Sequence, residues 1–552
     1  MLLSNLNLLA TAPGGVARLR ELILTLAVQG KLVPQDTKDE PANELLKKIR
    51  TEKDRLIAEE EKPFGLPRGW EWARLGDLCS YIQRGKGPVY ADHSEHRVIS
   101  QKCVRWYGLN LEPARFVTAE SLTKYEAIRF LQTGDLLWNS TGTGTIGRAC
   151  LVPPAQDKAE LVADSHVTVV RPVQLNAWFL WRWIQSPYVQ NEIEGSASGT
   201  TNQIELNTST VVNHPIPVPP LVEQSRIVTR VEELMRLCDA LEAKAQLAAT
   251  QHAQLVSTLL ATLTESETPA QLADNWHRIA THFDLLLDRP EAVDALEQTI
   301  LQLAVRGLLV PQDPRDEPAS ELLKKIRAEK DKLIAEGKIK RDKPLPPIAE
   351  DEQPFALPIG WSWARFPELG EFGRGKSKHR PRNDPSLFNP PNYPLIQTGE
   401  VSRAKGIVEE VHSYYSDMGL AQSRMWPKGT LCITIAANIA ESAVLGFDCC
   451  FPDSVVGFVP ANAMGNVEYF LLFVETARAD LLAFAPATAQ KNINLEILSS
   501  LLIPIPPLNE LTRIVTRVAQ LRRLCADLRQ RQTASQSTQA HLAEALIVDL
   551  SA

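Results

Sequence analysis

The chain has 552 residues, of which 44% are hydrophobic and 23% are charged, and its formal net charge at pH 7 is -7. This length predicts about three or four domains, and the composition is typical of a soluble globular protein rather than a membrane protein. The acidic balance gives no overall attraction to nucleic acid, so binding of DNA would require local clusters of basic residues.

The eight cysteines include no C-x-x-C pair. This spacing predicts neither a zinc site nor a disulfide framework, and buried free thiols are expected instead. The first residues, MLLSNLNLLATAPGG, lack the basic leader and the longer apolar run of a secretion signal. We therefore expect a cytoplasmic protein without a metal site.

The first predicted element is a helical region over residues 1–62. Its amphipathic segment LRELILTLAVQG predicts a helix that ends at Gly30, and the charged segment ELLKKIRTEKDRLIAEEE predicts another. A globular stretch of strands and helices is predicted for residues 63–222. GDLLWNSTGTGTIGRACLV indicates a strand, a small-residue loop and a strand, SHVTVVRP indicates another strand, and AWFLWRWIQSPYVQNEIE is apolar at helical spacing.

A Pro-rich hinge, PIPVPPL, leads into a long helix that is predicted from Glu223 to Leu263, a stretch without Pro or Gly. At 1.5 Å per residue this helix would be about 60 Å long. Its apolar residues alternate at spacings of four and three, which is the pattern of a coiled-coil seam. The seam residues are Ile227, Val231, Leu234, Cys238, Leu241, Ala245 and Ala248.

The second half of the chain repeats the first. LAVQGKLVPQD at 26–36 returns as LAVRGLLVPQD at 303–313, GWEWAR at 69–74 returns as GWSWAR at 360–365, and RIVTRV at 226–231 recurs at 513–518. The repeat predicts a central helical region over 223–340, a second globular stretch over 341–508 and a C-terminal helix over 509–552. We therefore predict an α+β protein built as a tandem repeat, in which two similar α/β domains are separated by long antiparallel coiled-coil helices.

The segment LGEFGRGKSKHRPRND, residues 369–384, satisfies the nucleotide-binding pattern G-x-x-x-x-G-K-[ST]. Such a loop needs a hydrophobic strand before it and a helix after it, whereas Pro381 follows Ser377 too closely for a helix. The first copy has QRGKGPVY at this place, without the hydroxyl. We predict a flexible basic loop for the phosphates of nucleic acid, with a merely solvated loop as the alternative. No H-E-x-x-H or G-x-S-x-G motif is present, and we find no catalytic constellation.

The duplicated LP-x-GW-x-WAR domain start, the P-I-P-x-P-P-L…RIV segment and the ILQLAVRGLLVPQD element together resemble the specificity subunit of type I restriction-modification enzymes. The resemblance covers nearly the whole chain. It implies a chain without enzymatic activity, in which two target recognition domains each read one half of a split, asymmetric site in double-stranded DNA. The conserved helices would act as a ruler between these domains.

The resemblance also implies partners. Two methyltransferase subunits, which bind S-adenosylmethionine, would dock on the helices, and restriction subunits, which use ATP and Mg, would join through them. No cofactor is expected on this chain, and no membrane. Two alternatives remain open: the specificity chain of a two-component methyltransferase and nuclease system without a motor, and a coiled-coil adaptor that binds only proteins.

Candidate DNA-binding residues are basic or amide side chains, with some hydroxyls from small-residue loops, because Arg, Asn and Gln can form two hydrogen bonds to a base edge. In residues 63–222 the candidates are Arg84, Lys86, Lys102, Arg105, Ser140, Thr141, Thr143, Asn202 and Gln203. In residues 341–508 they are Arg374, Lys376, Lys378, Arg380, Arg382, Gln397, Thr398, Lys491 and Asn492. Trp106 and Tyr107, beside Arg105, are expected either to stack against or wedge between bases or to pack in the core.

Overall fold

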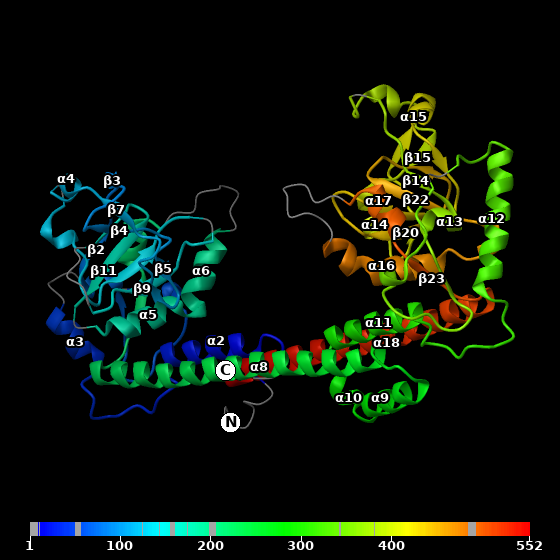
Figure 1. Ribbon diagram of the computed structural model, residues 1–552. Helices are drawn as coiled ribbons and strands as arrows, with labels where there is room; N and C mark the ends of the chain where they lie inside the picture. Colours follow the sequence, from blue (N-terminus) through cyan, green and yellow to red (C-terminus); the bar gives the residue numbers. More distant parts are fainter. Residues whose placement is uncertain are drawn as a thin grey trace. The chain divides into compact units, whose positions relative to one another are not determined.

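The computed structural model (Figure 1) describes residues 9, 12–49, 57–123, 125–142, 144–154, 161–173, 175–197, 206–341, 344–379, 381–483 and 493–551. The chain divides into two compact units. Unit 1 comprises Met1–Ala248 and Ser535–Ala552, and unit 2 comprises Ala249–Ala534. Each unit contains one globular domain, whose strands run from residue 71 to 218 in unit 1 and from 362 to 505 in unit 2. The predicted α+β class is confirmed, because each of these domains combines sheets with helices.

The first globular domain contains two four-stranded sheets, with strand orders β2-β11-β8-β9 and β10-β4-β7-β3. All neighbours in the first sheet are antiparallel, whereas β10 and β4 are parallel. Every residue of β8 is buried, as expected for a strand covered on both faces. The strands are β1 (Glu71–Arg74), β2 (Cys79–Arg84), β3 (Tyr90–Ala91), β4 (Arg97–Ile99), β5 (Val104–Arg105), β6 (Gly108–Leu109), β7 (Arg115–Val117), β8 (Leu136–Asn139), β9 (Ala149–Leu151), β10 (Leu161–Ala163), β11 (Val167–Pro172) and β12 (Pro215–Val218).

The helices of unit 1 include the first predicted N-terminal helix and the start of the second, whose described part ends at Ile49. The predicted apolar segment after β11 forms two helices, α5 and α6. Trp181 of α5 donates its indole N–H to the carbonyl of Ala149 in β9 at 2.9 Å, so α5 packs on the edge of the first sheet. The helices are α2 (Gly15–Val28), α3 (Ala42–Ile49), α4 (Ala119–Leu122), α5 (Ala177–Gln185), α6 (Pro187–Ala197), α7 (Thr208–Asn213) and the first part of α8 (Leu221–Thr264).

The second globular domain has the same core sheets, with orders β14-β22-β19-β20-β16 and β17-β15-β21-β18. β14, β22, β19 and β20 correspond to β2, β11, β8 and β9, and the parallel pair β15 and β21 corresponds to β4 and β10. The strands are β13 (Ser362–Ala364), β14 (Gly370–Arg374), β15 (Tyr393–Leu395), β16 (Ile407–Val408), β17 (Ser413–Tyr415), β18 (Met425–Trp426), β19 (Leu431–Thr434), β20 (Ser442–Leu445), β21 (Cys449–Cys450), β22 (Val455–Pro460) and β23 (Ile503–Ile505).

The helices α9 and α10 of unit 2 were not predicted from the sequence. Thr268 caps α9 by accepting a hydrogen bond from the backbone of Gln271 at 3.2 Å, and Pro269 opens the helix, which is a recognisable start signal. The helices are α9 (Pro269–Thr281), α10 (Phe283–Leu286), α11 (Pro290–Val305), α12 (Ala319–Ala335), α13 (Phe366–Leu369), α14 (Thr398–Arg403), α15 (Asp417–Gln422), α16 (Glu468–Ala483), α17 (Leu495–Ser500) and most of α18 (Leu508–Ser551).

The first and last strands of each globular domain pair with each other. β1 from the GWEWAR block is antiparallel to β12 from the PIPVPPL block, with Trp72 opposite Pro217. β13 and β23 repeat this pairing, with Trp363 opposite Pro504. The predicted Pro-rich hinge is therefore a β-strand in a two-stranded sheet, where proline is tolerated because the outer edge needs no ladder donor. This pairing closes each domain at its base.

The conserved helical block packs directly against this base. Gly30 has φ 71°, and a Cβ atom there would lie 2.6 Å from Pro67 Cγ and 2.9 Å from Trp70 Cζ2. Gly307 has φ 72° and would meet Pro358 and Trp361 in the same way. Glycine is thus required by both its conformation and the close approach of the tryptophan. This contact explains why LAV-x-G and LP-x-GW recur together in the sequence.

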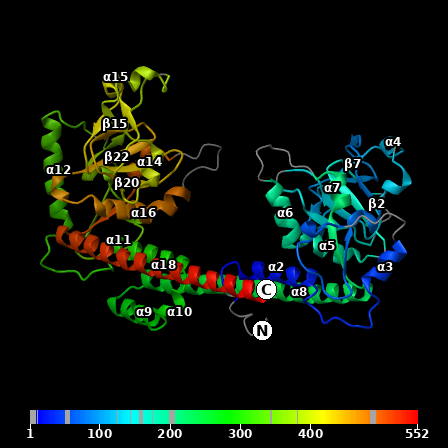
Figure 2. The same cartoon turned by 180° about the vertical axis from the view of Figure 1, so that it is seen from behind.

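The long helices α8 and α18 both have 44 residues, which confirms the predicted helix from Glu223 to Leu263. In unit 1, α8 lies along α2 in both views (Figures 1 and 2), and Arg20 forms ion pairs of 2.8 Å with Asp239 and Glu242. In unit 2, Arg529 of α18 pairs with Asp294 of α11 at 2.6 Å. Each long helix therefore packs against the short helix of its own copy, α8 against α2 and α18 against α11.

The far end of each long helix belongs to the core of the other copy. Ala543 of α18 is buried in the core of unit 1, whereas Val256, Leu260 and Leu263 of α8 are buried in the core of unit 2. α8 therefore begins in unit 1 and ends in unit 2, whereas α18 begins in unit 2 and ends in unit 1. Of the predicted seam of α8, Ile227, Val231 and Cys238 are buried, Leu234 and Leu241 are half-buried, and Ala245 and Ala248 are exposed.

Candidate nucleic-acid interface

Three loops at one end of the first globular domain are joined by backbone hydrogen bonds. Loop A is residues 84–87, loop B is residues 139–148, and loop C is residues 163–167. The amide of Gly85 donates to the carbonyl of Val167 at 3.0 Å, and the amide of Lys86 donates to that of Ala163 at 3.2 Å. The amide of Ser140 donates to the carbonyl of His166 at 2.9 Å. We call this arrangement the three-loop cluster.

The second globular domain has the same cluster, in which loop A is residues 374–378, loop B is residues 434–441 and loop C is residues 451–455. The amides of Gly375 and Lys376 donate to the carbonyls of Val455 at 2.9 Å and Phe451 at 3.2 Å. The amide of Ile435 donates to the carbonyl of Ser454 at 3.0 Å. The same three backbone hydrogen bonds thus join the loops in both domains, although most side chains and the length of loop B differ.

The close contact between loops A and C requires a glycine in loop A. A Cβ atom on Gly85 would lie 2.0 Å from the Ala163 carbonyl oxygen, and one on Gly375 would lie 2.3 Å from the Phe451 carbonyl oxygen. Both distances are far shorter than any real contact of a Cβ atom. Glycine therefore lets loop A lie directly on loop C, and the following lysine, exposed in both domains, is held in a fixed place.

Three of the predicted residues of the first domain meet in this cluster. Arg84 is half-buried and donates to the carbonyls of Ser140 at 3.4 Å and Leu206 at 3.3 Å, so its guanidinium group fastens loop B. Lys86 is exposed. The hydroxyl of Thr141, half-buried, is 2.7 Å from Nδ1 of His166.

Ser140 does not present its hydroxyl at the surface. Its side chain is fully buried, lies 2.5 Å from the Thr168 hydroxyl and donates to the carbonyl of Trp138. The Ser140 hydroxyl is therefore not available at the surface in this structure, because Ser140 directly follows the buried strand β8. Ser140 supports the loop instead.

The remaining candidates of the first domain lie in the segment that leads to the β5–β6 hairpin. Lys102 is exposed and Arg105 is half-buried. They follow Gln101, whose side chain accepts a hydrogen bond from Thr145 of loop B at 3.0 Å. Trp106 and Tyr107 form the hairpin turn with exposed fractions of 39% and 77%, so they do not pack in the core.

In the second domain, loop A carries several basic side chains beside one acid. Arg374 donates through Nε to the carbonyl of Asp453 at 3.0 Å, and Arg382 forms an ion pair of 3.1 Å with the Asp453 carboxylate. Lys376 and Lys378 are exposed. Asp453 of loop C thus orients two arginines while the lysines face solvent.

Gln397 and Thr398 follow β15 at the start of α14. Gln397 is exposed and Thr398 is half-buried. The preceding amide, that of Ile396, donates to the carbonyl of Cys450 at 3.0 Å, which places this turn next to the strand that enters loop C. Six candidates lie outside the described residues and have no structural account here: Thr143, Asn202, Gln203, Arg380, Lys491 and Asn492.

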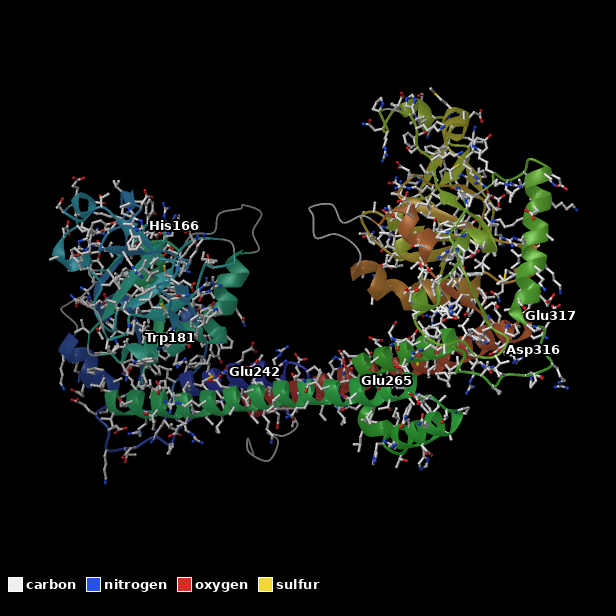
Figure 3. All side chains as sticks on the ribbon, viewed as in Figure 1. His166, Trp181, Glu242, Glu265, Asp316 and Glu317 are labelled. Atoms are coloured by element: carbon white, nitrogen blue, oxygen red, sulfur yellow. The ribbon has the colours of Figure 1, made fainter. Side chains whose placement is uncertain are left out.

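Two exposed residues of the cluster were not predicted. His166 of loop C is exposed, and Figure 3 shows it on the side of the first globular domain away from α8. Asn438 is exposed at the tip of loop B in the second domain. Loop C reads ADSHV in the first copy and FPDSV in the second, and loop B also differs between the copies, so comparison of the copies gave no signal for either residue.

The pKa values of two carboxyl groups near the cluster are shifted in opposite directions. Burial raises the pKa of Asp164 in loop C above its ordinary value, while the hydrogen bond from the His166 amide acts in the opposite direction. Hydrogen bonds from the Ser386 hydroxyl and amide, followed by one from His379, lower the pKa of Asp384 to about 2. Asp384 remains ionised and holds His379 of the basic segment at 2.9 Å.

The nucleotide-binding pattern does not form a phosphate loop. Gly370 to Arg374 is strand β14, paired with β22, so the first four spacer residues are extended rather than looped. No helix follows within the described residues 375–379 and 381–384. The backbone amides of Gly375 and Lys376 already donate to loop C. In the part of the chain that the structure describes, no three His, Cys, Asp or Glu residues could hold a metal ion, and no helix is long and apolar enough to cross a membrane.

Comparison with known proteins agrees with the repeat. The family model of the type I restriction modification DNA specificity domain matches residues 67–251 and 358–535. The specificity subunit of the type I restriction enzyme EcoEI from Escherichia coli is 35% identical, over 96% of this chain and 93% of that protein. The EcoAI specificity subunit from the same species is 34% identical over the same shares.

A chain solved in a study of complex assembly and conformational transition of the type I R-M system has a similar fold. Its TM-score is 0.50 with 19% identity, covering 89% of this chain and 99% of that chain. The match of two specificity domains and of the whole length does not favour a protein-only adaptor or a two-component system. This chain belongs to the family of type I restriction-modification specificity subunits and has two recognition domains, which lie within the matched residues 67–251 and 358–535.

Proposed function

We propose that the two three-loop clusters read the two halves of a bipartite, asymmetric site in double-stranded DNA. One observation carries this proposal: the same backbone hydrogen bonds between loops A, B and C hold unlike side chains in the two domains. Thr141 and His166 occupy the first cluster, whereas Asn438 and Asp453 occupy the second. Two recognition surfaces of one fold but different chemistry are suited to unlike half-sites, while a symmetric dimer would read a palindrome.

We further propose that the exposed basic side chains of loop A, Lys86 in one domain and Lys376 in the other, contact phosphates. Both follow a glycine that fixes their backbone on loop C. Phosphate contacts set the register of a protein on the duplex, and base contacts from loops B and C would then provide specificity. The net charge of -7 implies that much of the nonspecific affinity comes from partner subunits.

The chain itself is proposed to be a non-catalytic, cytoplasmic scaffold. The repeated helical blocks offer two equivalent docking places, which supports binding of two methyltransferase subunits that carry S-adenosylmethionine. Restriction subunits with ATP and Mg would join this core. The relatives are specificity subunits of restriction enzymes, which supports partners of this kind.

The test uses the chain co-expressed with its methyltransferase subunit. The purified complex modifies a library of random duplex DNA with S-adenosylmethionine, and the methylated positions are sequenced. We expect one motif with two unlike parts at a fixed separation. A palindromic motif, or methylation without sequence preference, would contradict the proposal. The chain alone should neither bind S-adenosylmethionine in a calorimetric titration nor methylate DNA.

A further inference from the structure

Loop B of the second recognition domain contains two alanines in the left-handed backbone conformation. Ala437 has φ 64° and Ala440 has φ 59°, and among the described residues no other residue except glycine has a positive φ. This conformation is disfavoured for a residue with a Cβ atom, and it persists only where the surroundings enforce it. In the first domain, the position equivalent to Ala440 is Gly147, with φ 81°.

The equivalence of these positions follows from their hydrogen bonds. The amide of Ala440 donates to the carbonyl of Thr434 at 2.9 Å, and the amide of Gly147 donates to that of Asn139 at 3.0 Å. Each accepting residue ends the strand before loop B. The second domain thus has the same left-handed conformation at this position although its residue, Ala440, carries a Cβ atom. The first domain has glycine there.

Buried groups stabilise this conformation of loop B in the second domain. The hydroxyl of Thr434, which is fully buried, donates to the carbonyl of Asn438 and accepts from the amide of Glu441 at 3.1 Å. Ile439 and Ala440 are only 6% and 2% exposed and belong to the core of unit 2. The tip of the loop, Ala437 and Asn438, is exposed. The backbone at Ala437 and Asn438 therefore has little freedom to move.

The side-chain amide of Asn438 has no hydrogen-bond partner among the residues that the structure describes. Its loop is bonded to loop C through Ile435 and Ser454, and loop A with Lys376 is bonded to the same loop through Phe451 and Val455. An unpaired amide on a rigid backbone loses little conformational entropy when it binds. The Asn side chain offers a donor and an acceptor that match N7 and N6 of adenine.

We propose, building on the function proposed above, that Asn438 is a specificity-determining residue of the second recognition domain. It hydrogen-bonds a base edge, for which adenine is the best fit, in the half-site that this domain reads. Ala437 and Ala440 act as positioning residues that aim its amide into the groove.

The experiment sequences the methylated sites of the complex that carries Asn438→Ala. Discrimination at one position of one half-site should fall about 5- to 150-fold, with the other half-site unchanged. Asn438→Asp should move the preference at that position from adenine toward cytosine, because a carboxylate only accepts hydrogen bonds. Gln520→Ala, which removes an exposed amide from α18, is the matched control and should keep the wild-type motif.

A second variant tests the positioning role. Ala437→Gly accepts φ 64° without strain, so the melting temperature of the complex should stay the same or rise. Discrimination at the position read by Asn438 should nevertheless fall, because the tip gains freedom. A residue with a purely structural role would not combine unchanged stability with weaker discrimination.

The outcomes separate this inference from the function on which it rests. If the wild-type complex gives no bipartite motif, the proposed function fails. If the wild type gives that motif and Asn438→Ala leaves it unchanged, only the inference is wrong. A uniform loss of methylation on all sequences at an unchanged melting temperature would show a general contact and would also overturn it.

Discussion

Trp361 donates its indole N–H to the carboxylate of Glu510 at 3.1 Å, and the two side chains are 7% and 1% exposed. Trp361 belongs to the base of the second recognition domain, and Glu510 lies in the first turn of α18. Trp70 and Glu223 occupy the equivalent positions in unit 1 and are 4% and 1% exposed. A buried carboxyl group therefore stands at each junction between a recognition domain and its long helix.

The first prediction concerns the pH dependence of this junction. Burial raises the pKa of Glu510 above its ordinary value, and the hydrogen bond from Trp361 only partly offsets this. A carboxyl group with a raised folded pKa contributes stability that is fully present below its unfolded pKa and is lost as the pH rises through the folded pKa. Glu510→Gln should thus unfold at a higher urea concentration than the wild type at pH 8.

The difference between Glu510→Gln and the wild type should shrink as the pH is lowered toward 4, where the wild-type carboxyl group is protonated as well. Urea unfolding at several pH values measures this. Glu496→Gln, which changes an exposed carboxyl group, is the control. A variant that is less stable than the wild type at pH 8 would show that the ionised carboxylate is favoured at the junction.

The second prediction compares two glycines of one loop. Gly85→Ala places a Cβ atom 2.0 Å from the Ala163 carbonyl oxygen, so loops A and C must separate. We expect a loss of about 2 kcal/mol or more, as for other overpacked sites. Gly87→Ala finds no atom within 4 Å and should be nearly neutral. Thermal unfolding and methylation of the bipartite site measure the effect of each variant. Equal effects of the two variants would contradict the close contact of loop A with loop C.

The sequence predicted the conserved blocks well because they recur. The helices α2, α8, α11 and α18 and the strand-loop-strand segments appear where the two copies agree in pattern. Their signals are local: apolar spacing, glycine caps and β-branched runs. The contact of Gly30 with Trp70 adds a tertiary reason for the recurrence that the sequence alone did not reveal.

The three-loop cluster could be predicted only in part. Arg84 and Lys86 were found because RGK recurs, whereas the bond from Ser140 to His166 joins segments that are far apart in the sequence. Their side chains diverge between the copies, because each domain has its own surface. The burial of Ser140 likewise depends on where β8 ends, and strand ends are the least predictable feature of a sequence.

The third prediction concerns a buried ion pair of the first recognition domain. Asp135 is 1% exposed and lies 2.7 Å from Arg171 Nε. Asp135→Asn leaves a guanidinium group without its counter-charge in the interior, and we expect a loss of about 3–5 kcal/mol. Asp453→Asn breaks the exposed pair with Arg382 and should cost less than about 1 kcal/mol. Urea unfolding of the two variants compares them, and similar losses would contradict the assignment.

The fourth prediction concerns the basic loop. Lys376→Ala should weaken DNA binding by the complex equally on all sequences, and the slope of log affinity against log salt should fall by about 0.9 for one lost phosphate contact. Ser377→Ala should leave both unchanged, and the chain should bind no ATP. Lys324→Ala, on α12, is the charge-matched control. A salt titration measures the slopes, and stoichiometric ATP binding that Ser377→Ala abolishes would restore the nucleotide-loop hypothesis.

The last prediction concerns the length of α8. Its residues 221–248 belong to unit 1 and its residues 249–264 to unit 2, so one continuous helix contributes to both. Residues 242–248 are all exposed, so an insertion there disturbs no buried contact. Four added residues lengthen the helix by about 6 Å, which is of the order of two base-pair steps along DNA. We expect the separation between the two half-sites of the methylated motif to increase. The same four residues inserted among residues 338–341, which follow α12, should leave the separation unchanged. If the α8 variant methylates DNA with the original separation, the helix does not act as a ruler.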